Sequence, residues 1–220
     1  PTWPPPEAFR SELRLDSAGQ AQSIRTPGTL STDRPKQTPS DTFSYDPGNP
    51  VPTLWEPDWF SRVSDRSELN HRHDIRRYRT PPLEQNQEIV GNPEAVLHVS
   101  SDAPDTDFFA RLVDEAPDGT AMEICYGMIR ARHRQSLNRE DLLIPGEVAE
   151  LRIAMGITAC RLPAGHRIRL EITSSDFPNH DRNHNIGRND LLDPELRVAD
   201  NTVWHTEEHP SRLVLPVVEG

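Results

Sequence analysis

The sequence predicts an all-β fold, a two-sheet sandwich of which the jelly roll is one form. Three observations support this prediction. Short runs of alternating apolar residues recur after Gln87, turn-forming residues separate them, and no strand–helix–strand rhythm is present. The 220 residues suit one domain of this class, and because only 34% of them are hydrophobic we expect a thin core and long loops.

The N-terminal third is rich in proline and has few strand signals. The run FRSELRLDS alternates well enough for a strand, with Phe9, Leu13 and Leu15 on one face. Residues 25–39 lack the apolar content for an element of their own and predict a surface loop. In residues 41–53 the Asp-Pro-Gly and Asn-Pro sequences predict successive turns.

Five further alternating runs follow and predict consecutive strands. Their apolar faces are Ala95, Leu97 and Val99; Phe108, Ala110 and Leu112; Met122, Ile124 and Tyr126; Ala149, Leu151, Ile153 and Met155; and Ile168, Leu170 and Ile172. The Pro-Asp-Gly turn at residues 116–119 predicts a hairpin. Arg169 and Glu171 should then face solvent. Pro216 places the last strand at a sheet edge or a bulge.

Alternate arginines occupy the run MIRARHR. Arg130, Arg132 and Arg134 would share one strand face, which indicates a solvated surface rather than a binding patch. Short helices of one or two turns are expected within Ser136–Gly146 and Gly187–Arg197. The full expectation is an all-β sandwich with long loops and one or two short helices.

Charge and composition exclude several partners. The formal net charge of −11 argues against nucleic acid, which requires clustered basic residues. The sequence contains no apolar run of about 18 residues and no signal-peptide pattern, so no membrane partner is expected and a soluble, cytoplasmic protein is the default. Cys125 and Cys160 are too few for a disulfide scaffold and fit small buried hydrophobes, with their bonding state left open.

The stretch DFPNHDRNHNIG is the densest polar cluster. Asp181, Asn183 and Asn185 have the one-three-five spacing of a calcium loop. Ile186 and Leu192, however, stand where that loop needs a glycine and an acidic residue. The spacing therefore argues against calcium.

Zinc is disfavoured at the same stretch. His180 and His184 are four residues apart, which brings two ligands together only on a helix, whereas Pro178 and Gly187 indicate a loop. We expect a long turn held by Asx side chains, with the two histidines not converging on one position. No metal or cofactor is predicted.

No catalytic residue is predicted either. The Gly-x-Ser-x-Gly sequence of a nucleophile elbow does not occur. The acids of SSDAPDTDF and the histidines of HTEEHP have no nucleophile beside them in sequence and are interpreted as turn and network residues.

An ordered series of motifs identifies a family resemblance. The motifs are TFSYDPGNPVPT, YRTPPLEQNQEIVG, VSSDAPDTDFFARLVDEAPDGTAM, GMIRARHRQSL, LPAGHRIRLEITSSDFPNHDRNHNIG and HTEEHPSRLVLPV. From about Trp3 to Val218 the chain resembles the C-terminal non-catalytic domain of the Xaa-Pro dipeptidyl-peptidase and cocaine-esterase-like (CocE/NonD) serine hydrolases. Residues 1–220 would form this one accessory domain, with residues 1–8 as a linker from an upstream domain.

The resemblance implies a galactose-binding-domain-like jelly roll that follows an α/β-hydrolase catalytic domain in the same polypeptide. The family cleaves Xaa-Pro dipeptides, esters, or acyl and β-lactam side-chain amides, so the parent protein would be a dipeptidyl-peptidase, esterase or acylase. Its Ser-His-Asp triad lies in the hydrolase domain, and no residue of this chain matches it. A homo-oligomer is also compatible with the sequence.

The run LWEPDWF is the candidate contribution to a substrate cleft or a domain interface. Leu54, Trp55, Trp59 and Phe60 lie in a proline-containing loop directly after DPGNPVPT. Family members often carry Gly-rich sequence here, and this chain has Trp-Glu-Pro instead. Two other interpretations stay open: the aromatic residues simply cap the sandwich, or the chain is a stand-alone carbohydrate- or ligand-binding module in which they stack on a sugar.

Overall fold

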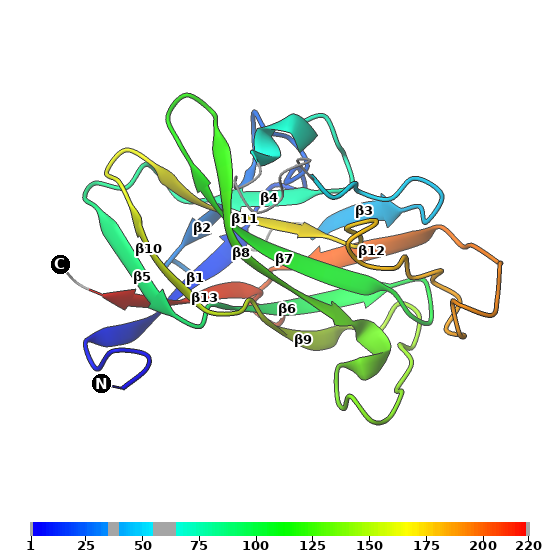
Figure 1. Ribbon diagram of the computed structural model, residues 1–220. Helices are drawn as coiled ribbons and strands as arrows, with labels where there is room; N and C mark the ends of the chain where they lie inside the picture. Colours follow the sequence, from blue (N-terminus) through cyan, green and yellow to red (C-terminus); the bar gives the residue numbers. More distant parts are fainter. Residues whose placement is uncertain (1, 35–39, 55–64, 219–220) are drawn as a thin grey trace.

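The computed structural model describes residues 2–34, 40–54 and 65–218, and it confirms the expected all-β fold (Figure 1). The described strands are β1 (Ala8–Asp16), β2 (Gly28–Ser31), β3 (Asp41–Tyr45), β4 (Arg76–Arg79), β5 (Gln87–Gly91), β6 (Glu94–Ser101), β7 (Asp107–Glu115), β8 (Ala121–Arg130), β9 (Ala149–Ala154), β10 (Thr158–Leu162), β11 (Arg167–Thr173), β12 (Ala199–Trp204) and β13 (Arg212–Val218). Two 3-10 helices, η1 (Arg66–Leu69) and η2 (Ala131–His133), interrupt the loops.

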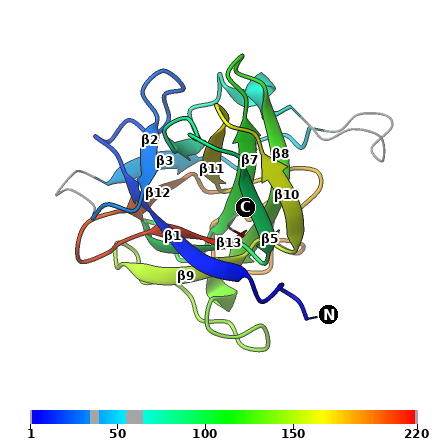
Figure 2. The same ribbon diagram turned by 90° about the vertical axis from the view of Figure 1, so that its left-hand side faces the viewer.

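The strands wrap around a single apolar interior. Hydrogen-bonded neighbours follow the order β3-β12-β6-β13-β1-β2-β4-β11-β7-β8, with β9 added beside β6 and β5 and β10 paired at one end. One layer therefore carries β12, β6, β13 and β1, and the facing layer carries β4, β11, β7 and β8 (Figure 2). Strand β2 connects the two layers by hydrogen bonds, because it pairs antiparallel with β1 of one layer and parallel with β4 of the other.

The alternating patterns correctly predicted much of the core. Phe108, Ala110 and Leu112 of β7 are fully buried and pack with the apolar face of β6 and with Leu170 of β11. The expected hairpin is also confirmed, because β7 and β8 are antiparallel and the Ala116 amide donates to the Thr120 carbonyl across the turn.

One strand was missed, and one of the two alternatives for another was wrong. Residues 28–31 were expected in a loop but form β2, and a Cβ at Gly28 would lie 2.3 Å from Cδ1 of Tyr78, so a glycine lets the strand approach that ring. β13 is not an edge strand, since β1 pairs on one side and β6 and β5 on the other. Pro216 lies where the pairing passes from β6 to β5, which accommodates its missing N–H.

The predicted helices are also placed wrongly. Ser136–Gly146 and Gly187–Arg197 contain turns and bends. In the second stretch the side chain of Asn189 accepts the Leu191 amide at 3.0 Å, and Asp193 accepts the Glu195 amide at the same distance. These Asx turns take backbone donors that a helix would use.

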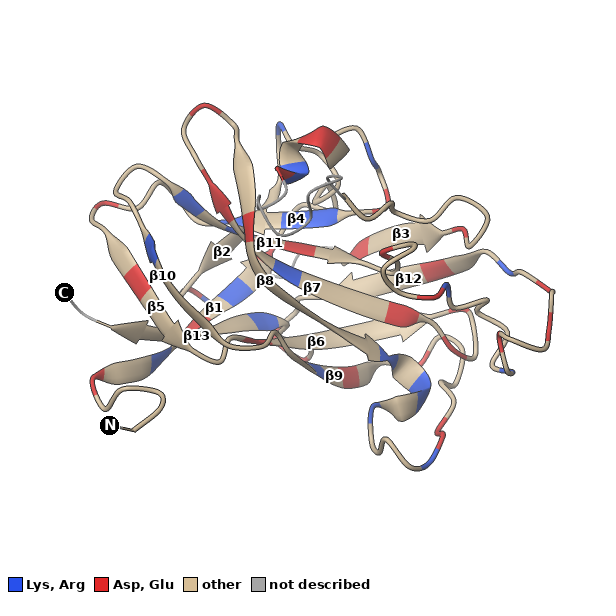
Figure 3. Cartoon of the chain, in the orientation of Figure 1, with Lys and Arg blue, Asp and Glu red and all other residues tan. Residues whose placement is uncertain are grey.

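Three charged residues expected in solvent are buried. Arg132 is 3% exposed because β8 ends at Arg130 and η2 turns the next arginine inward. Arg169 is 1% exposed and Glu171 is fully buried. The segment 65–75, which includes η1, lies over β4 and β11 (Figure 3). Arg66 donates to Glu171, Arg169 to Asn70 and Arg77 to the Leu69 carbonyl, so these charged side chains are enclosed between sheet and loop.

Candidate functional site

The sequence-predicted site lies partly outside the described residues. Trp55, Trp59 and Phe60 fall in residues 55–64, and only Leu54 can be placed. Its side chain packs on a small second core of Val51, Leu69 and Ile75, which is separate from the sandwich interior. Leu54 thus joins the residues before the 55–64 segment to those after it.

A pocket of about 180 Å³ opens beside Leu54 on the outer face of the β7–β8 layer. It is lined by Thr53, Leu54, Arg66, Arg111, Glu123, Tyr126, Asp176 and Asn179. Four of these eight residues carry charge, so the pocket is a polar recess, with Leu54 as its aliphatic wall.

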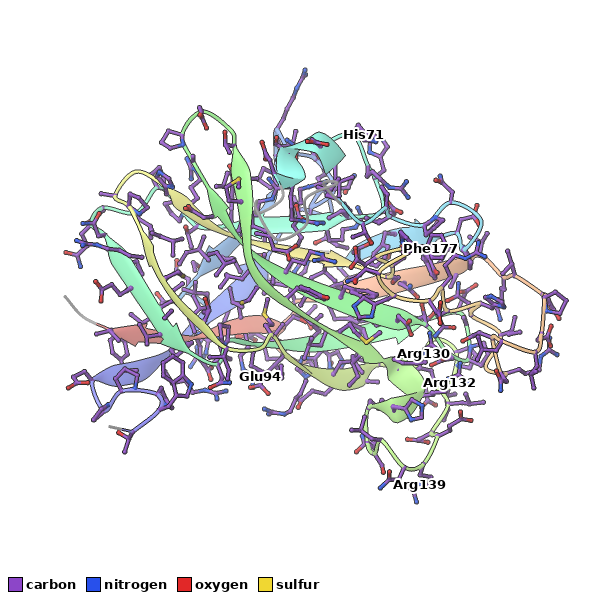
Figure 4. The ribbon with its side chains drawn as sticks, in the orientation of Figure 1. His71, Glu94, Arg130, Arg132, Arg139 and Phe177 are labelled. Atoms are coloured by element: carbon purple, nitrogen blue, oxygen red, sulfur yellow. The ribbon has the colours of Figure 1, made fainter. Side chains whose placement is uncertain are left out.

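The residues before the 55–64 segment are held by the start of the DFPNHDRNHNIG loop. Phe177 donates its amide to the Val51 carbonyl at 3.0 Å, and Thr53 donates its amide to the Phe177 carbonyl at 2.8 Å. The Asn179 amide then donates to Oγ1 of Thr53 at 3.1 Å. The two chain segments therefore run side by side as a short parallel bridge, and Figure 4 shows the position of Phe177.

Arg111 of β7 lies beneath this bridge and is almost completely buried. Its Nη2 is 2.8 Å from Oδ2 of Asp176, its Nη1 donates to Oε2 of Glu123 at 2.6 Å, and its guanidinium lies over the Tyr126 ring, 4.4 Å from the centroid. Burial disfavours the guanidinium charge, but Glu123 and Asp176 outweigh it, so the pKa of Arg111 lies above its ordinary value.

The residues after the 55–64 segment are held by a second set of contacts. Asp65 caps η1 and accepts the Ser67 amide at 2.9 Å and the Ala121 amide at 3.0 Å. Arg66 points inward, with its Nε 2.5 Å from Oε2 of Glu171 and its Nη1 3.6 Å from Oε2 of Glu123. Both ends of the segment are therefore attached to the same sheet face.

Glu171 is the deepest charge in this network. Burial alone would raise its pKa, but the guanidinium groups of Arg66, Arg169 and Arg77 lower it to about 2. A carboxylate that is ionised at neutral pH and surrounded by three arginines holds β4, β11 and η1 together. The regular spacing of Arg169 and Glu171 on one strand face was visible in the sequence, but the covering segment was not.

The remainder of the DFPNHDRNHNIG loop is held by its Asx side chains, as expected. Asn183 donates from its amide nitrogen to Asp105 at 2.7 Å and to Asp107 at 2.8 Å, and the Asn185 amide donates to Oδ1 of Asn183 at 2.9 Å. Asp107 and Asp190 both accept from Arg130, whose position at the end of β8 is shown in Figure 4.

The two histidines of this loop have different neighbours. His180 stacks edge-on against Phe109 and Tyr126, and Nδ1 of His184 lies 2.9 Å from the Asp193 carbonyl oxygen. Within the described residues, no group of three or more His, Cys, Asp or Glu side chains has the arrangement of a metal site.

A serine, a histidine and an aspartate do meet elsewhere, but not as a catalytic relay. Ser17 donates to Oδ2 of Asp41 at 2.6 Å, and both Oγ of Ser17 and Oδ2 of Asp41 face the same nitrogen, Nε2, of the fully buried His205. A relay needs the serine hydroxyl to donate to the imidazole, whereas Ser17 donates its proton to Asp41, and the acid that faces the other nitrogen, Asp16, lies 3.8 Å from Nδ1. This cluster ties the end of β1 to β3 and the β12–β13 connection.

One end of the sandwich exposes a set of apolar side chains on two adjoining loops. Leu137, Leu191 and Leu192 are 86%, 84% and 83% exposed. The loops are joined where Arg132 donates to the Arg188 carbonyl at 3.0 Å, and Arg132 is itself held by Asp105. The described residues contain no helix long and apolar enough to cross a membrane.

Comparison with known proteins assigns the family. The X-Pro dipeptidyl-peptidase C-terminal non-catalytic domain matches residues 1–214. The chain belongs to this family. The resemblance deduced from the motifs is therefore confirmed, and CocE/NonD hydrolases are also among its structural neighbours.

Its relatives in this family are hydrolases of greater length. Cocaine esterase from Rhodococcus sp. (strain MB1 Bresler) is 38% identical over 225 residues, which covers 99% of this chain and 39% of the esterase. An aminopeptidase from a marine sediment Thaumarchaeota archaeon has a similar structure, with a TM-score of 0.88 and 26% sequence identity. The match covers 99% of this chain and 38% of the aminopeptidase chain. An α-amino acid ester hydrolase shares the fold at a TM-score of 0.83 and 24% identity, covering 94% of this chain and 36% of that one.

Proposed function

We propose that this X-Pro dipeptidyl-peptidase C-terminal domain packs on an α/β-hydrolase catalytic domain of the same polypeptide and helps to shape its substrate cleft. The parent activity would be that of a dipeptidyl-peptidase, esterase or acylase. Residues 1–220 form one non-catalytic accessory domain in this proposal, with residues 1–8 as the linker.

The observation that carries the cleft role is the double attachment of the 55–64 segment. Thr53 is bonded to the 176–179 turn, and Asp65 is bonded to β8 and η1. Because both attachments use buried or backbone groups of one sheet face, Leu54 and Asp65, on either side of residues 55–64, lie at defined positions. Such positioning is what a loop needs in order to contribute side chains to a neighbouring active site.

The apolar end of the sandwich supports the packing role. Leu137, Leu191 and Leu192 lie on loops that a buried ion network stabilises, so their exposure is not a result of disorder in those loops. Arg188 and Asp193 form an ion pair on the same loop as Leu191 and Leu192. Exposed apolar side chains next to charged groups are common at protein interfaces.

The first experiment is enzymatic. In the parent polypeptide, Trp55→Ala and Trp59→Ala should lower kcat/KM for ester or Xaa-Pro substrates about tenfold, the effect of about 1.4 kcal/mol of lost transition-state binding. Phe9→Ala, an exposed aromatic on β1, is the control. Unchanged kinetics in both tryptophan variants would contradict the cleft role.

The second experiment uses the 220-residue chain alone. It should not turn over ester or Xaa-Pro chromogenic substrates, and turnover that a serine-directed reagent inhibits would overturn the proposal. Sugar binding by this chain that is lost in Trp59→Ala would favour a stand-alone carbohydrate-binding module instead.

A further inference from the structure

We infer that Arg111 is a positioning residue that fixes two described stretches, Val51–Leu54 and Asp65–Arg66, at the same time. The inference about structure rests only on described contacts. Its consequence for catalysis rests on the proposed function.

The first branch runs from Arg111 to Leu54. Nη2 of Arg111 pairs with Asp176 at 2.8 Å, and both side chains are almost completely buried. Asp176 begins a turn in which its Oδ2 also accepts a hydrogen bond from Nδ2 of Asn179 at 3.0 Å. That turn bonds the Val51–Leu54 segment through the Thr53 amide.

The second branch runs from Arg111 to Asp65. Nη1 of Arg111 donates to Oε2 of Glu123 at 2.6 Å, and the same oxygen lies 3.6 Å from Nη1 of Arg66. Arg66 is the first residue of η1, and its neighbour Asp65 accepts the Ala121 amide from the first residue of β8. Glu123 is on β8 as well, so this branch fixes the Asp65–Arg66 stretch.

The geometry requires arginine in particular. A guanidinium presents donors on two sides of a plane, so one side chain can hold two carboxylates that belong to different elements. The flat group also lies over the Tyr126 ring. A lysine ammonium at the same place is a point charge that can follow one carboxylate but cannot hold both in a fixed plane.

The test measures amide hydrogen exchange in the 220-residue chain. The Thr53 amide reports the first branch and the Ala121 amide reports the second. Arg111→Lys should increase exchange at both amides by at least about tenfold, which is the order of effect expected for a lost charged hydrogen bond. The amide of Val214 in the central strand β13 monitors global unfolding.

Matched variants separate the branches. Asp176→Asn should increase exchange at Thr53 and leave Ala121 unchanged, and Arg66→Lys should do the reverse. If Arg111→Lys affects one amide alone, or neither, the inference is overturned. If the lysine variant fails to fold, Glu123→Gln is measured in its place. Increased exchange at the Ala121 amide alone would support the inference, and unchanged exchange at that amide would contradict it.

Kinetics in the parent polypeptide then separate this inference from the proposed function. Arg111→Lys should raise KM more than it lowers kcat, because it displaces the pocket wall formed by Thr53 and Leu54 without touching the reacting groups. If exchange increases at both amides while KM and kcat stay unchanged, Arg111 still positions the two stretches, and it is the cleft role that fails.

Discussion

The Asp41 carboxylate and the His205 imidazole face one another inside the sandwich, with 3.1 Å between Oδ2 and Nε2. Burial raises the pKa of Asp41, but hydrogen bonds from His205, Ser17 and Tyr78 outweigh this effect and leave that pKa below its ordinary value. A carboxyl group with a lowered folded-state pKa stabilises the fold above its unfolded pKa, and this stabilisation is lost as pH falls through the folded pKa.

We therefore expect Asp41→Asn to destabilise the domain at neutral pH by about 2–3 kcal/mol, the order of effect when a buried carboxylate that accepts several hydrogen bonds is lost. Urea unfolding at a series of pH values is the measurement, and the deficit should shrink in acid. Ser17→Ala, which keeps the carboxylate, should cost only about 1 kcal/mol. An Asp41→Asn deficit independent of pH would contradict this account.

Glu171 should give the larger acid dependence. Its folded pKa of about 2 lies below the ordinary value of 4.5, so its contribution is complete above pH 4.5 and is lost as pH falls toward 2. Glu171→Gln should cost about 3–5 kcal/mol at pH 7 because three arginines lose their central partner. The control is Glu150→Gln on the exposed face of β9, which should change stability by less than about 0.5 kcal/mol. If both variants lost the same free energy of unfolding, burial would not account for the effect of Glu171.

Gly127 should not tolerate a side chain. A Cβ at this position of β8 would lie 2.0 Å from the carbonyl oxygen of Ala154 in β9, and backbone cannot yield as a flexible side chain does. Gly127→Ala should lower the free energy of unfolding by about 1–3 kcal/mol. Gly48→Ala is a fitting control, since its Cβ would meet only the Asp46 side chain at 3.1 Å. A Gly127→Ala protein as stable as this control would exclude the close approach of β8 and β9.

The two cysteines should react slowly in the folded protein. Both are free thiols that pack against the core, and burial raises the pKa of Cys125 to about 12 and also raises that of Cys160. Because thiolate is the reactive form, modification by a disulfide reagent at pH 8 should be slow, with two thiols appearing promptly on addition of denaturant. Rapid modification without denaturant would contradict the buried environment.

Periodicity could predict the inner face of the sandwich, and it did so for Phe108, Leu112 and Leu170, because alternate residues of a strand point to one side. It could not predict that Arg169 and Glu171 are buried as well. These two residues alternate with apolar ones, which is the pattern of a strand with one face in solvent. The segment 65–75 covers that face through ion pairs, and ion pairs between distant residues leave no pattern in the sequence.

The candidate cleft or interface residues stay a prediction. Leu54 lines a polar pocket, and Trp55, Trp59 and Phe60 lie outside the described residues. Arg111 had no signal, because a single arginine in an apolar strand is unremarkable until its two carboxylate partners, from distant parts of the chain, are known.

The position of β13 has a consequence for synthesis. This strand is synthesised after every strand with which it pairs, β1 on one side and β5 and β6 on the other. The nascent sheet therefore keeps an open seam along Ala8–Arg14 of β1 until Arg212–Val218 emerge, and the non-local closure that follows is the slow kind. A stop codon at Arg212 would leave an unclosed, aggregation-prone intermediate instead of a slightly shortened domain.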